Sequence, residues 1–284
     1  MKNYKLGIIG HGYVGESQSF AFSPSFDVRV YDKDSLKSTH SLDEVLDSDF
    51  VFVCVPTPMK KDGSQDLSIL DSVFDDLNIS DIDGLIILKS TVIPDNLSAL
   101  SKKLKFVYNP EFLREKYAES DFINGEIILF GGDFEACKKV SDFYTQFTLC
   151  KQKDHFITDK ITASLVKYSI NSFLATKVIF FNQLKSVLDL SSSDENWDKF
   201  IEIVSSDKRV GKTHMDVPGH DGREGFGGAC FPKDISALKE FSSNIGANFS
   251  LISEVIKINN YIRSVYNEPT DREIEQNIFF KEKK

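Results

Sequence analysis

The segment GIIGHGYVGES, residues 7–17, constrains the fold more than any other stretch of this sequence. It places Gly10, Gly12 and Gly15 in the spacing G-x-G-x-x-G, directly after a strand-like run and before a helical pattern. Asp32 closes the next strand-like run, 22 residues after Gly10. Strand, glycines, helix and carboxylate in this order are typical of a dinucleotide-binding βαβ unit.

The predicted site has a direct physical basis. Glycines allow backbone N–H groups and the helix N-terminus to approach a pyrophosphate. Asp32 would bind the ribose hydroxyls and repel a 2'-phosphate, which favours NAD over NADP. Lys37 lies where it could reach the adenosine ribose, although a lysine in a loop is usually solvated. The alternative is that the glycines only form a tight turn and Asp32 only solvates a strand end.

The first half of the chain alternates short β-branched runs with amphipathic stretches. This order is expected of a parallel sheet covered by helices on both faces. Strands are predicted at 6–10, 28–31, 50–55, 85–89, 105–108 and 126–130, and helices at 66–77 and 133–147.

From Asp159 the pattern changes to one long helical period that reaches residue 190, with Thr158 or Asp159 as its cap. Its apolar residues surround most of the helix, which predicts a central helix that two subunits could share. Further helices are predicted at 194–206 and 249–267, and the charged tail 267–284 is expected to be frayed.

The fold class predicted is therefore α/β. A Rossmann-like, doubly wound parallel sheet over 1–157 would bind NAD. An all-helical domain over 158–284, with one long central helix, would carry the substrate and the dimer contact.

Composition excludes several classes of protein. A net charge of −9 argues against a nucleic-acid partner, because such proteins usually carry a basic face. The four cysteines form no C-x-x-C pair, which disfavours zinc ribbons and disulfide scaffolds. Neither a membrane-length apolar run nor a secretory leader is recognisable, so we expect a cytoplasmic location and no membrane partner.

Polar residues follow several of the predicted elements. VCVPTP (53–58) and KSTV (89–92) end two strands, YNPEFLRE (108–115) follows the next, and Lys167 and Asn171 share one helix face. The stretch GFGGACFPKD (225–234) places a thiol, Cys230, on mobile glycine backbone. A structural thiol, a metal ligand or a nucleophile are the open readings, and the wide cysteine spacing disfavours the metal.

These motifs, together with GHGYVG and LVKYSINSFLATK, resemble the UDP-glucose/GDP-mannose dehydrogenase family in order and spacing over residues 1–266. The resemblance implies oxidation of a nucleotide-sugar primary alcohol, with UDP-glucose expected, to a carboxylate by two NAD in succession. It also implies that Cys230 attacks the intermediate aldehyde, forming a thiohemiacetal that is oxidised to a thioester.

The resemblance assigns the remaining site residues. The catalytic set is Cys230, Lys167, Asn171, Asp234, Glu111 and Thr91. The cofactor-binding set is Gly10, Gly12, Tyr13, Val14, Gly15, Asp32, Lys37, Val55, Pro56, Thr57, Ser90, Thr91, Glu115 and Lys233. The substrate-binding set is Glu111, Phe112, Leu113, Arg114, Lys167, Asn171, Arg209, Phe226, Gly227 and Gly228, with Arg209 offered to a neighbouring subunit of a homodimer.

Two departures from the family are visible. Ser164 stands where relatives carry a glutamate, and relatives continue past residue 266 into a second α/β domain that covers the nucleotide. Two alternative functions therefore stay open. One is a two-electron hydroxyacid dehydrogenase, which would have no use for Cys230. The other is an inactive protein that binds NAD or a nucleotide sugar.

Overall fold

The computed structural model describes residues 4–22, 26–80, 82–150 and 154–280. The chain forms two compact units. The N-terminal unit comprises residues 1–57 and 66–167, and the C-terminal unit comprises residues 58–65 and 168–284. The two units join at Lys167 and Tyr168, within one helix.

The N-terminal unit contains a seven-stranded sheet in the order β2-β1-β3-β4-β5-β6-β7 among the described residues. Its strands are β1 (Lys5–Ile9), β2 (Asp27–Tyr31), β3 (Phe50–Val53), β4 (Leu85–Leu88), β5 (Val107–Tyr108), β6 (Ile127–Gly131) and β7 (Asp154–Thr158). The predicted α/β class is confirmed. Two details differ: β5 and β6 pair antiparallel, Tyr108 opposite Gly131, and β7 was not predicted.

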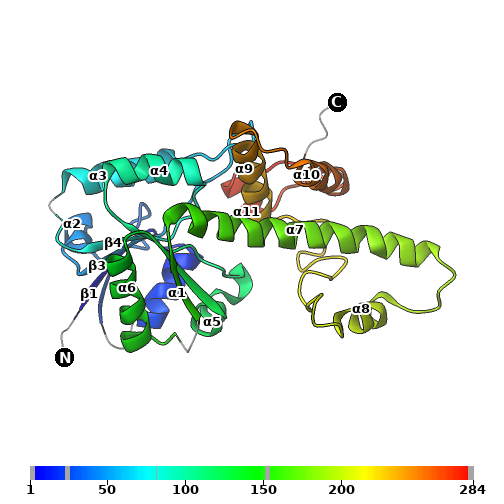
Figure 1. The fold of residues 1–284 in the computed structure, drawn as a ribbon, viewed down its shortest axis with the longest axis horizontal. Coiled ribbons are helices and arrows are strands. Elements are labelled where there is room, and N and C mark those ends of the chain that lie inside the picture. Colours follow the sequence, from blue (N-terminus) through cyan, green and yellow to red (C-terminus); the bar gives the residue numbers. More distant parts are fainter. Residues whose placement is uncertain (1–3, 23–25, 81, 151–153, 281–284) are drawn as a thin grey trace. The chain divides into compact units, whose positions relative to one another are not determined.

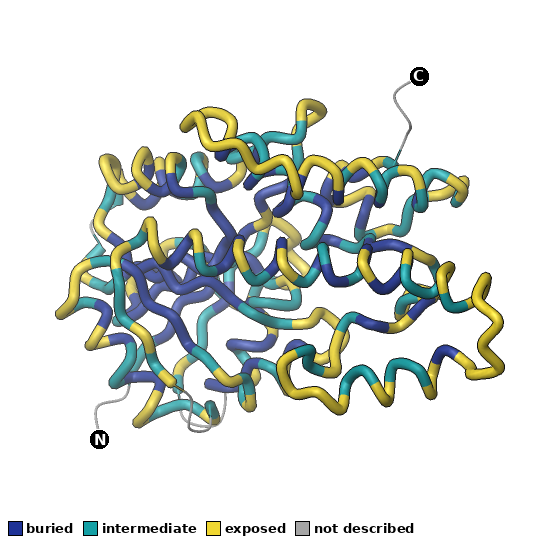
Figure 2. The backbone as a smooth tube through the Cα atoms, turned by 45° about the vertical axis from the view of Figure 1, so that its right-hand side comes forward, coloured by how far each residue is buried: buried dark blue, intermediate teal, exposed yellow. Residues whose placement is uncertain are grey.

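Alternating side chains of each strand pack into two hydrophobic clusters, one on each face of the sheet. In β3, Phe50 and Phe52 enter one cluster and Val51 and Val53 the other. Helices α1 (Tyr13–Phe22), α5 (Ala118–Asn124) and α6 (Phe134–Phe147) cover the first face; α2 (Leu42–Leu46), α3 (Ser68–Ile79) and α4 (Pro94–Lys103) cover the second (Figure 1). The five inner strands are accordingly buried along most of their length (Figure 2), whereas the edge strands β2 and β7 are mostly half-buried or exposed. Each fully buried large apolar side chain stabilises the fold by about 1.5–3 kcal/mol.

Helix α7 (Lys160–Leu190) is the predicted long helix. Asp159 is its cap, because its carboxylate accepts the N–H of Thr162 at 2.9 Å. In the C-terminal unit its apolar side chains belong to two clusters. Ala175 and Ile179 pack with residues of the glycine-rich segment, α9 (Phe231–Asn244) and α10 (Ser250–Arg263), while Phe181 packs with Trp197 of α8 (Trp197–Ser205).

The expectation of a frayed C-terminal tail is wrong for residues 267–280. Helix α11 (Asp271–Glu275) begins at a capping box between Thr270 and Glu273. The side chain of Glu273 is fully buried and Ile278 is 1% exposed. The charged composition was misleading because one of these charges pairs with the buried Arg263 of α10. Residues 281–284 lie outside the described part of the chain.

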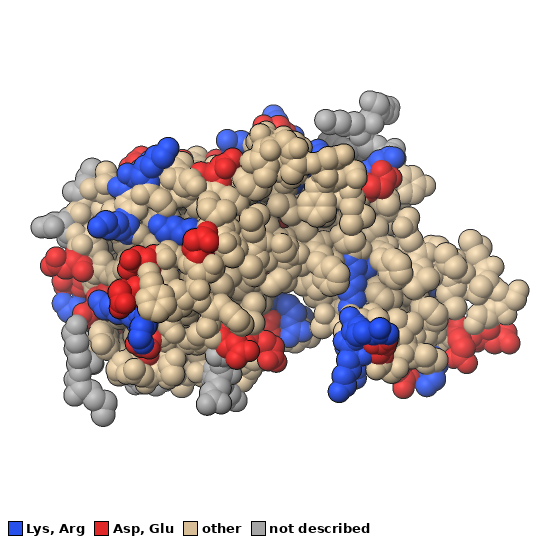
Figure 3. Space-filling model, viewed as in Figure 1, with Lys and Arg blue, Asp and Glu red and all other residues tan. Residues whose placement is uncertain are grey.

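Charged side chains on the face shown in Figure 3 form small groups of both signs. Among the described residues, no helix has the length and apolar character needed to cross a membrane.

Candidate functional site

The glycine turn after β1 has a backbone that its glycines require. Gly10 has φ +93°, and a Cβ there would lie 2.9 Å from the carbonyl oxygen of Cys54. A Cβ on Gly15 would lie 2.2 Å from the carbonyl oxygen of Gly10, so α1 could not pack this closely on the turn. A Cβ on Gly12, by contrast, would meet no atom within 4 Å. The protein itself therefore does not require glycine at position 12.

Gly12 provides the test of whether a dinucleotide fits. Gly12 directly precedes α1, whose first two residues are Tyr13 and Val14. The open space at Gly12 therefore adjoins the N–H groups of a helix N-terminus. Space next to such groups suits the pyrophosphate of NAD. Asp32, just after β2, is held beside this turn because its carboxylate accepts the N–H of His11 at 2.6 Å. Lys37 is exposed on the following loop.

The strand order reverses between β1 and β3, which is where open α/β sheets bind ligands. At the same carboxyl edge of the sheet, two hydroxyl groups form hydrogen bonds between the segment after β3 and the segment after β4. Ser90 donates to the carbonyl of Val55 at 2.6 Å, and Thr57 donates to the carbonyl of Thr91 at 2.8 Å. Four of the predicted cofactor residues are thus brought together, and the fifth of this group, Pro56, is exposed.

The sequence analysis did not predict a buried polar network that lies just after β4 and β5. The side-chain oxygen of Asn109 accepts from Lys89 at 2.9 Å and from the hydroxyl of Tyr144 at 3.0 Å. Burial raises the pKa of Tyr144 well above its usual value, so this hydroxyl is a donor. Burial also raises the pKa of Cys54 to about 12, which makes it an inert core thiol, as its apolar strand predicts.

Glu111 and Lys167 form a buried ion pair in the N-terminal unit. Lys167 Nζ lies 3.1 Å from Glu111 Oε1, and the two side chains are 2% and 5% exposed. The other carboxylate oxygen accepts the N–H of Leu113 at 2.6 Å, and the ammonium lies 5.4 Å from the ring centre of Phe112. Such a pair contributes little net stability, because removing two charges from water is costly. Because Glu111 follows the carboxyl end of β5, the position of the pair favours a role in the reaction over a role in stability.

Arg114 and Glu115, the last two residues of the NPEFLRE motif, are exposed. Arg114 donates from Nε and Nη2 to Asp121 at 2.9 and 2.7 Å, and its side chain is 55% exposed. Glu115 is exposed and begins the short 3-10 helix η1 (Glu115–Tyr117). Ser164, at the position where the resemblance leads to an expected glutamate, donates to the carbonyl of Val92 at 2.7 Å.

In the C-terminal unit Cys230 is the N-cap residue of α9 and is half-buried. Asp234, one turn later, is 1% exposed, and its carboxylate accepts from Asn171 of α7 at 2.7 Å. Lys233 lies 2.5 Å from the other oxygen of the same carboxylate. Three of the predicted residues thus form one hydrogen-bonded group.

The glycine loop before Cys230 is fixed by residues that the sequence analysis did not single out. Asn259 of α10 accepts the N–H of Phe226 at 2.7 Å and donates to its carbonyl at 2.9 Å. Asn182 of α7 accepts the N–H of Gly225 at 2.9 Å. A signal was present: the buried face of α10 consists of Ile252, Val255, Asn259 and Arg263, so two polar residues occupy positions of an apolar helical stripe.

Arg209 lies on an exposed turn after α8. Its guanidinium pairs with Asp207, with Nη2 at 2.6 Å from the carboxylate, and its side chain is 89% exposed. Within the described part of the chain, Arg209 makes no hydrogen bond or ion pair with any other predicted substrate-binding residue.

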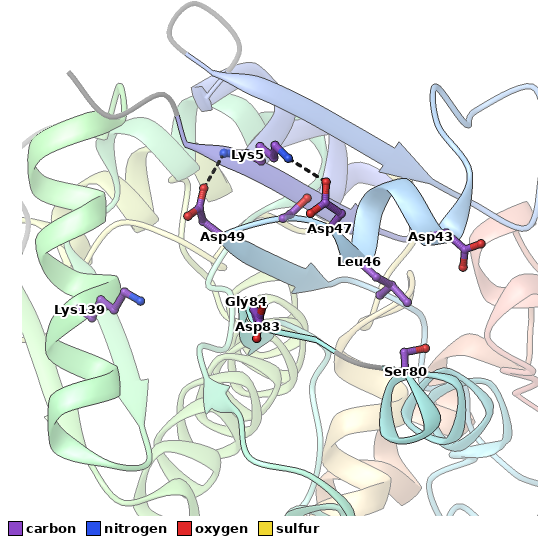
Figure 4. A pocket seen from close by; sticks show the side chains of 10 residues that line it. Lys5, Asp43, Leu46, Asp47, Asp49, Ser80, Asp83, Gly84 and Lys139 are labelled. Carbon is purple, nitrogen blue, oxygen red and sulfur yellow. Dashed lines mark hydrogen bonds and ion pairs between the residues drawn. The ribbon is translucent and has the colours of Figure 1, made fainter.

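One cavity of the N-terminal unit is lined by none of the predicted site residues. It has a volume of about 710 Å³ and adjoins the amino-terminal ends of β1, β3 and β4, whereas the predicted cofactor residues follow the carboxyl ends (Figure 4). Lys5 donates there to Asp47 and Asp49. We therefore place the candidate site by the strand ends and not by the cavity. No cluster of three potential metal-binding side chains occurs within the described ranges.

Comparison with known proteins agrees with this arrangement. Residues 28–148 match the NAD binding domain of the UDP-glucose/GDP-mannose dehydrogenase family, and residues 161–261 match the central domain of the same family. The chain belongs to this family. The first match confirms NAD as the predicted cofactor; the matched range contains Asp32, while the glycine turn precedes it.

Individual relatives differ in extent. UDP-glucose 6-dehydrogenase of Rickettsia bellii is 34% identical over 227 residues, which are 76% of this chain and 50% of the relative. The chain thus spans about half the length of the curated relatives it matches. The structure of a UDP-glucose dehydrogenase from Pyrobaculum islandicum aligns with a TM-score of 0.76 at 26% identity, covering 91% of this chain and 68% of that one. A 3-hydroxyisobutyrate dehydrogenase from Mycobacterium tuberculosis shares the fold, with a TM-score of 0.71, 16% identity and 98% and 97% coverage.

Proposed function

We propose that this chain oxidises the primary alcohol of a nucleotide sugar, with UDP-glucose as the expected substrate, to a carboxylate in two successive NAD-dependent steps. The observation that carries the proposal is the group at the N-terminus of α9. Cys230 is the N-cap residue of this helix, and the buried Asp234 one turn later accepts from Asn171. A thiol at such a position suits an enzyme that must hold an aldehyde covalently between two oxidations.

Bound NAD supplies the hydride acceptor for each oxidation. The chain would hold its pyrophosphate at Gly10, Gly12 and Gly15 with the N-terminus of α1, and its ribose at Asp32. The segments containing Val55, Thr57, Ser90 and Thr91 would line the rest of the site, and Tyr13, Val14, Lys37, Pro56, Glu115 and Lys233 remain proposed contacts.

In the first oxidation the substrate hydroxyl loses its proton as the carbon loses a hydride. Lys167 and Asn171, one turn apart on α7, would place an ammonium and an amide N–H at the developing alkoxide. Asp234 would accept the proton through a water, because its carboxylate is already oriented by Asn171 and Lys233.

In the second oxidation the Cys230 sulfur adds to the aldehyde carbon, and the carbonyl oxygen takes a proton to give a thiohemiacetal. Loss of a second hydride and of the hydroxyl proton leaves a thioester. Water then attacks the thioester carbon, the C–S bond breaks, and the sulfur leaves as a thiol. Glu111 would act as the base that removes the proton from this water, with Thr91 orienting it, because Lys167 holds the carboxylate in one position.

The substrate's sugar and nucleotide would be held by Phe112, Leu113, Arg114, Phe226, Gly227 and Gly228. Arg209 would contribute from a second subunit of a homodimer. The support for a dimer is an exposed apolar stripe on α7: Phe173, Phe180 and Val187 follow one another at seven-residue spacing and are 66%, 58% and 62% exposed.

The decisive experiment measures the ratio of NADH formed to sugar consumed. The chain is incubated with NAD and a panel of nucleotide sugars and hydroxyacids, and products are identified by mass. We expect a ratio of two and a uronate product. The variant Cys230→Ser should give a ratio of one or no turnover, whereas Cys150→Ser, a half-buried cysteine of the N-terminal unit, should behave as wild type.

A second function is supported by one observation. The fold shared with the 3-hydroxyisobutyrate dehydrogenase covers nearly the whole of both chains. A ratio of one with a hydroxyacid, unaffected by Cys230→Ser, would favour this two-electron reaction. Binding of NAD without turnover of any substrate would favour an inactive binding protein.

A further inference from the structure

The buried Arg263–Glu273 ion pair has no part in the proposed chemistry. Arg263 is the last residue of α10 and is 1% exposed. Glu273 lies in α11 and is fully buried. Arg263 Nη2 lies 2.6 Å from Glu273 Oε1, and its Nη1 lies 2.7 Å from Asp221. Two charges sealed this completely contribute little net stability unless further hydrogen bonds satisfy them.

Those further bonds lead to the glycine loop. Glu273 Oε1 also accepts the N–H of Gly228 at 3.2 Å, and Oε2 accepts the N–H of Thr270 at 2.7 Å. One carboxylate therefore connects α10, α11 and the loop that ends at Cys230. Gly228 has φ +73°, a conformation that needs an external contact to be selected from the many open to glycine.

Gly227 shows how closely the pair approaches the loop. A Cβ at this position would lie 2.2 Å from Arg263 Nη2 and 2.3 Å from Glu273 Oε1. The loop has no side chain at 227 or 228 with which to pack, so polar contacts to its backbone replace the packing. The same loop is also held by Asn259, one turn before Arg263 in α10, through both backbone groups of Phe226.

We infer that Arg263 and Glu273 are positioning residues, which fix the backbone of Gly227 and Gly228 and thereby the place of Cys230 at the N-terminus of α9. The inference rests on the proposed function for its catalytic consequence. Misplacing a reacting group by about 1 Å costs on the order of 100-fold in rate. Loss of Glu273 should therefore lower kcat by about that factor and leave the KM for NAD within about twofold, since all the proposed cofactor residues except Lys233 belong to the N-terminal unit.

The test compares Glu273→Ala with Glu273→Gln, which keeps an acceptor oxygen for Gly228. Glu275→Gln is the matched control, because Glu275 is exposed in the same helix and pairs only with Arg272 in the described contacts. Two readouts do not depend on turnover: hydrogen exchange of the peptide 224–230, and the rate at which iodoacetamide alkylates Cys230. We expect both to rise about tenfold in Glu273→Ala, less in Glu273→Gln, and not at all in Glu275→Gln.

Residues elsewhere in the chain distinguish partial unfolding of the whole protein from increased motion of the glycine loop alone, and serve as reporters. The single tryptophan, Trp197, is buried in another cluster of the C-terminal unit, so its fluorescence reports whether that unit stays folded. Alkylation of Cys54 and Cys137 reports opening of the N-terminal unit. If Glu273→Ala does not fold, Thr270→Ala removes only the cap of α11 and should raise the same two rates by a smaller factor.

The inference is overturned if exchange and alkylation at the loop stay at the wild-type rate while Glu273 is absent, or if they rise only together with those of the reporters. It is also overturned if kcat falls equally in Glu275→Gln. An absence of NADH formation by the wild type, with loop exchange still controlled by Glu273, would refute the proposed function and leave the positioning role intact.

Discussion

Replacing Lys167 by methionine removes the cation of the buried pair while keeping most of the side-chain volume. The Glu111 carboxylate, 5% exposed, then retains the N–H of Leu113 as its described donor but loses its counter-charge. Breaking a buried pair from one side costs about 3–5 kcal/mol, because an uncompensated charge stays inside. Lys167→Met should therefore lower the free energy of unfolding by about 4 kcal/mol.

The double variant Lys167→Met/Glu111→Gln separates this penalty from the value of the pair. It removes both charges and leaves an acceptor for Leu113, so its stability should lie within about 1 kcal/mol of the wild type. Urea denaturation at fixed protein concentration gives the three free energies and the coupling between the sites. A matched exposed pair, Lys138 and Asp142 on α6, should change stability by less than about 0.5 kcal/mol when its lysine is replaced.

The reasoning fails if Lys167→Met costs less than about 1 kcal/mol, since the site would then be solvated like a surface pair. It also fails if the double variant is as unstable as the two single changes added together. A double variant that is stable but does not form NADH would indicate that these charges serve catalysis and not the fold.

Three further predictions concern the N-terminal unit. Gly15→Ala should destabilise by about 1–3 kcal/mol, because its Cβ meets Gly10, whereas Gly12→Ala should keep wild-type stability and weaken NAD binding at least about tenfold in a fluorescence titration. Asp32→Ser should shift the NAD to NADP preference in kcat/KM by at least about tenfold towards NADP, and an unchanged ratio would contradict its ribose role. Burial raises the pKa of Cys54 from 9.0 to about 12, so above pH 9 the unfolded chain loses a proton that the folded chain keeps. Stability should then fall by up to about 1.4 kcal/mol per pH unit between pH 9 and 12, and Cys54→Ala should remove this contribution from the measured slope.

Strands with continuous apolar runs, such as β3 and β4, were predicted because their residues face a core on both sides. The strand that was missed, β7, has only half-buried or exposed residues and lies at the edge of the sheet, so no periodic pattern marks it. The antiparallel pairing of β6 was not predictable either. It rests on a single pair with β5, a strand of two residues, and the direction of a strand leaves no trace in its composition.

The candidate site shows the same division between local and distant information. The glycine turn, the strand-end hydroxyls and the Lys167 helix all follow local motifs and were predicted. The contacts of Glu273 with Arg263 and with Gly228 join residues 10 and 45 positions apart in the chain. Because a glutamate in a charged tail usually stays in water, only the folded arrangement distinguishes this one from its neighbours.

The two hydroxyl bonds between the segments after β3 and β4 have a thermodynamic consequence. Ser90 and Thr57 each hold the backbone of the opposite segment, so the conformational entropy of both segments is lost when the N-terminal unit folds. A dinucleotide that arrives at this edge meets backbone that is already ordered and does not have to immobilise it. The affinity for the dinucleotide should consequently vary little with thermal motion of these two segments, unlike the affinity of a site built from mobile segments.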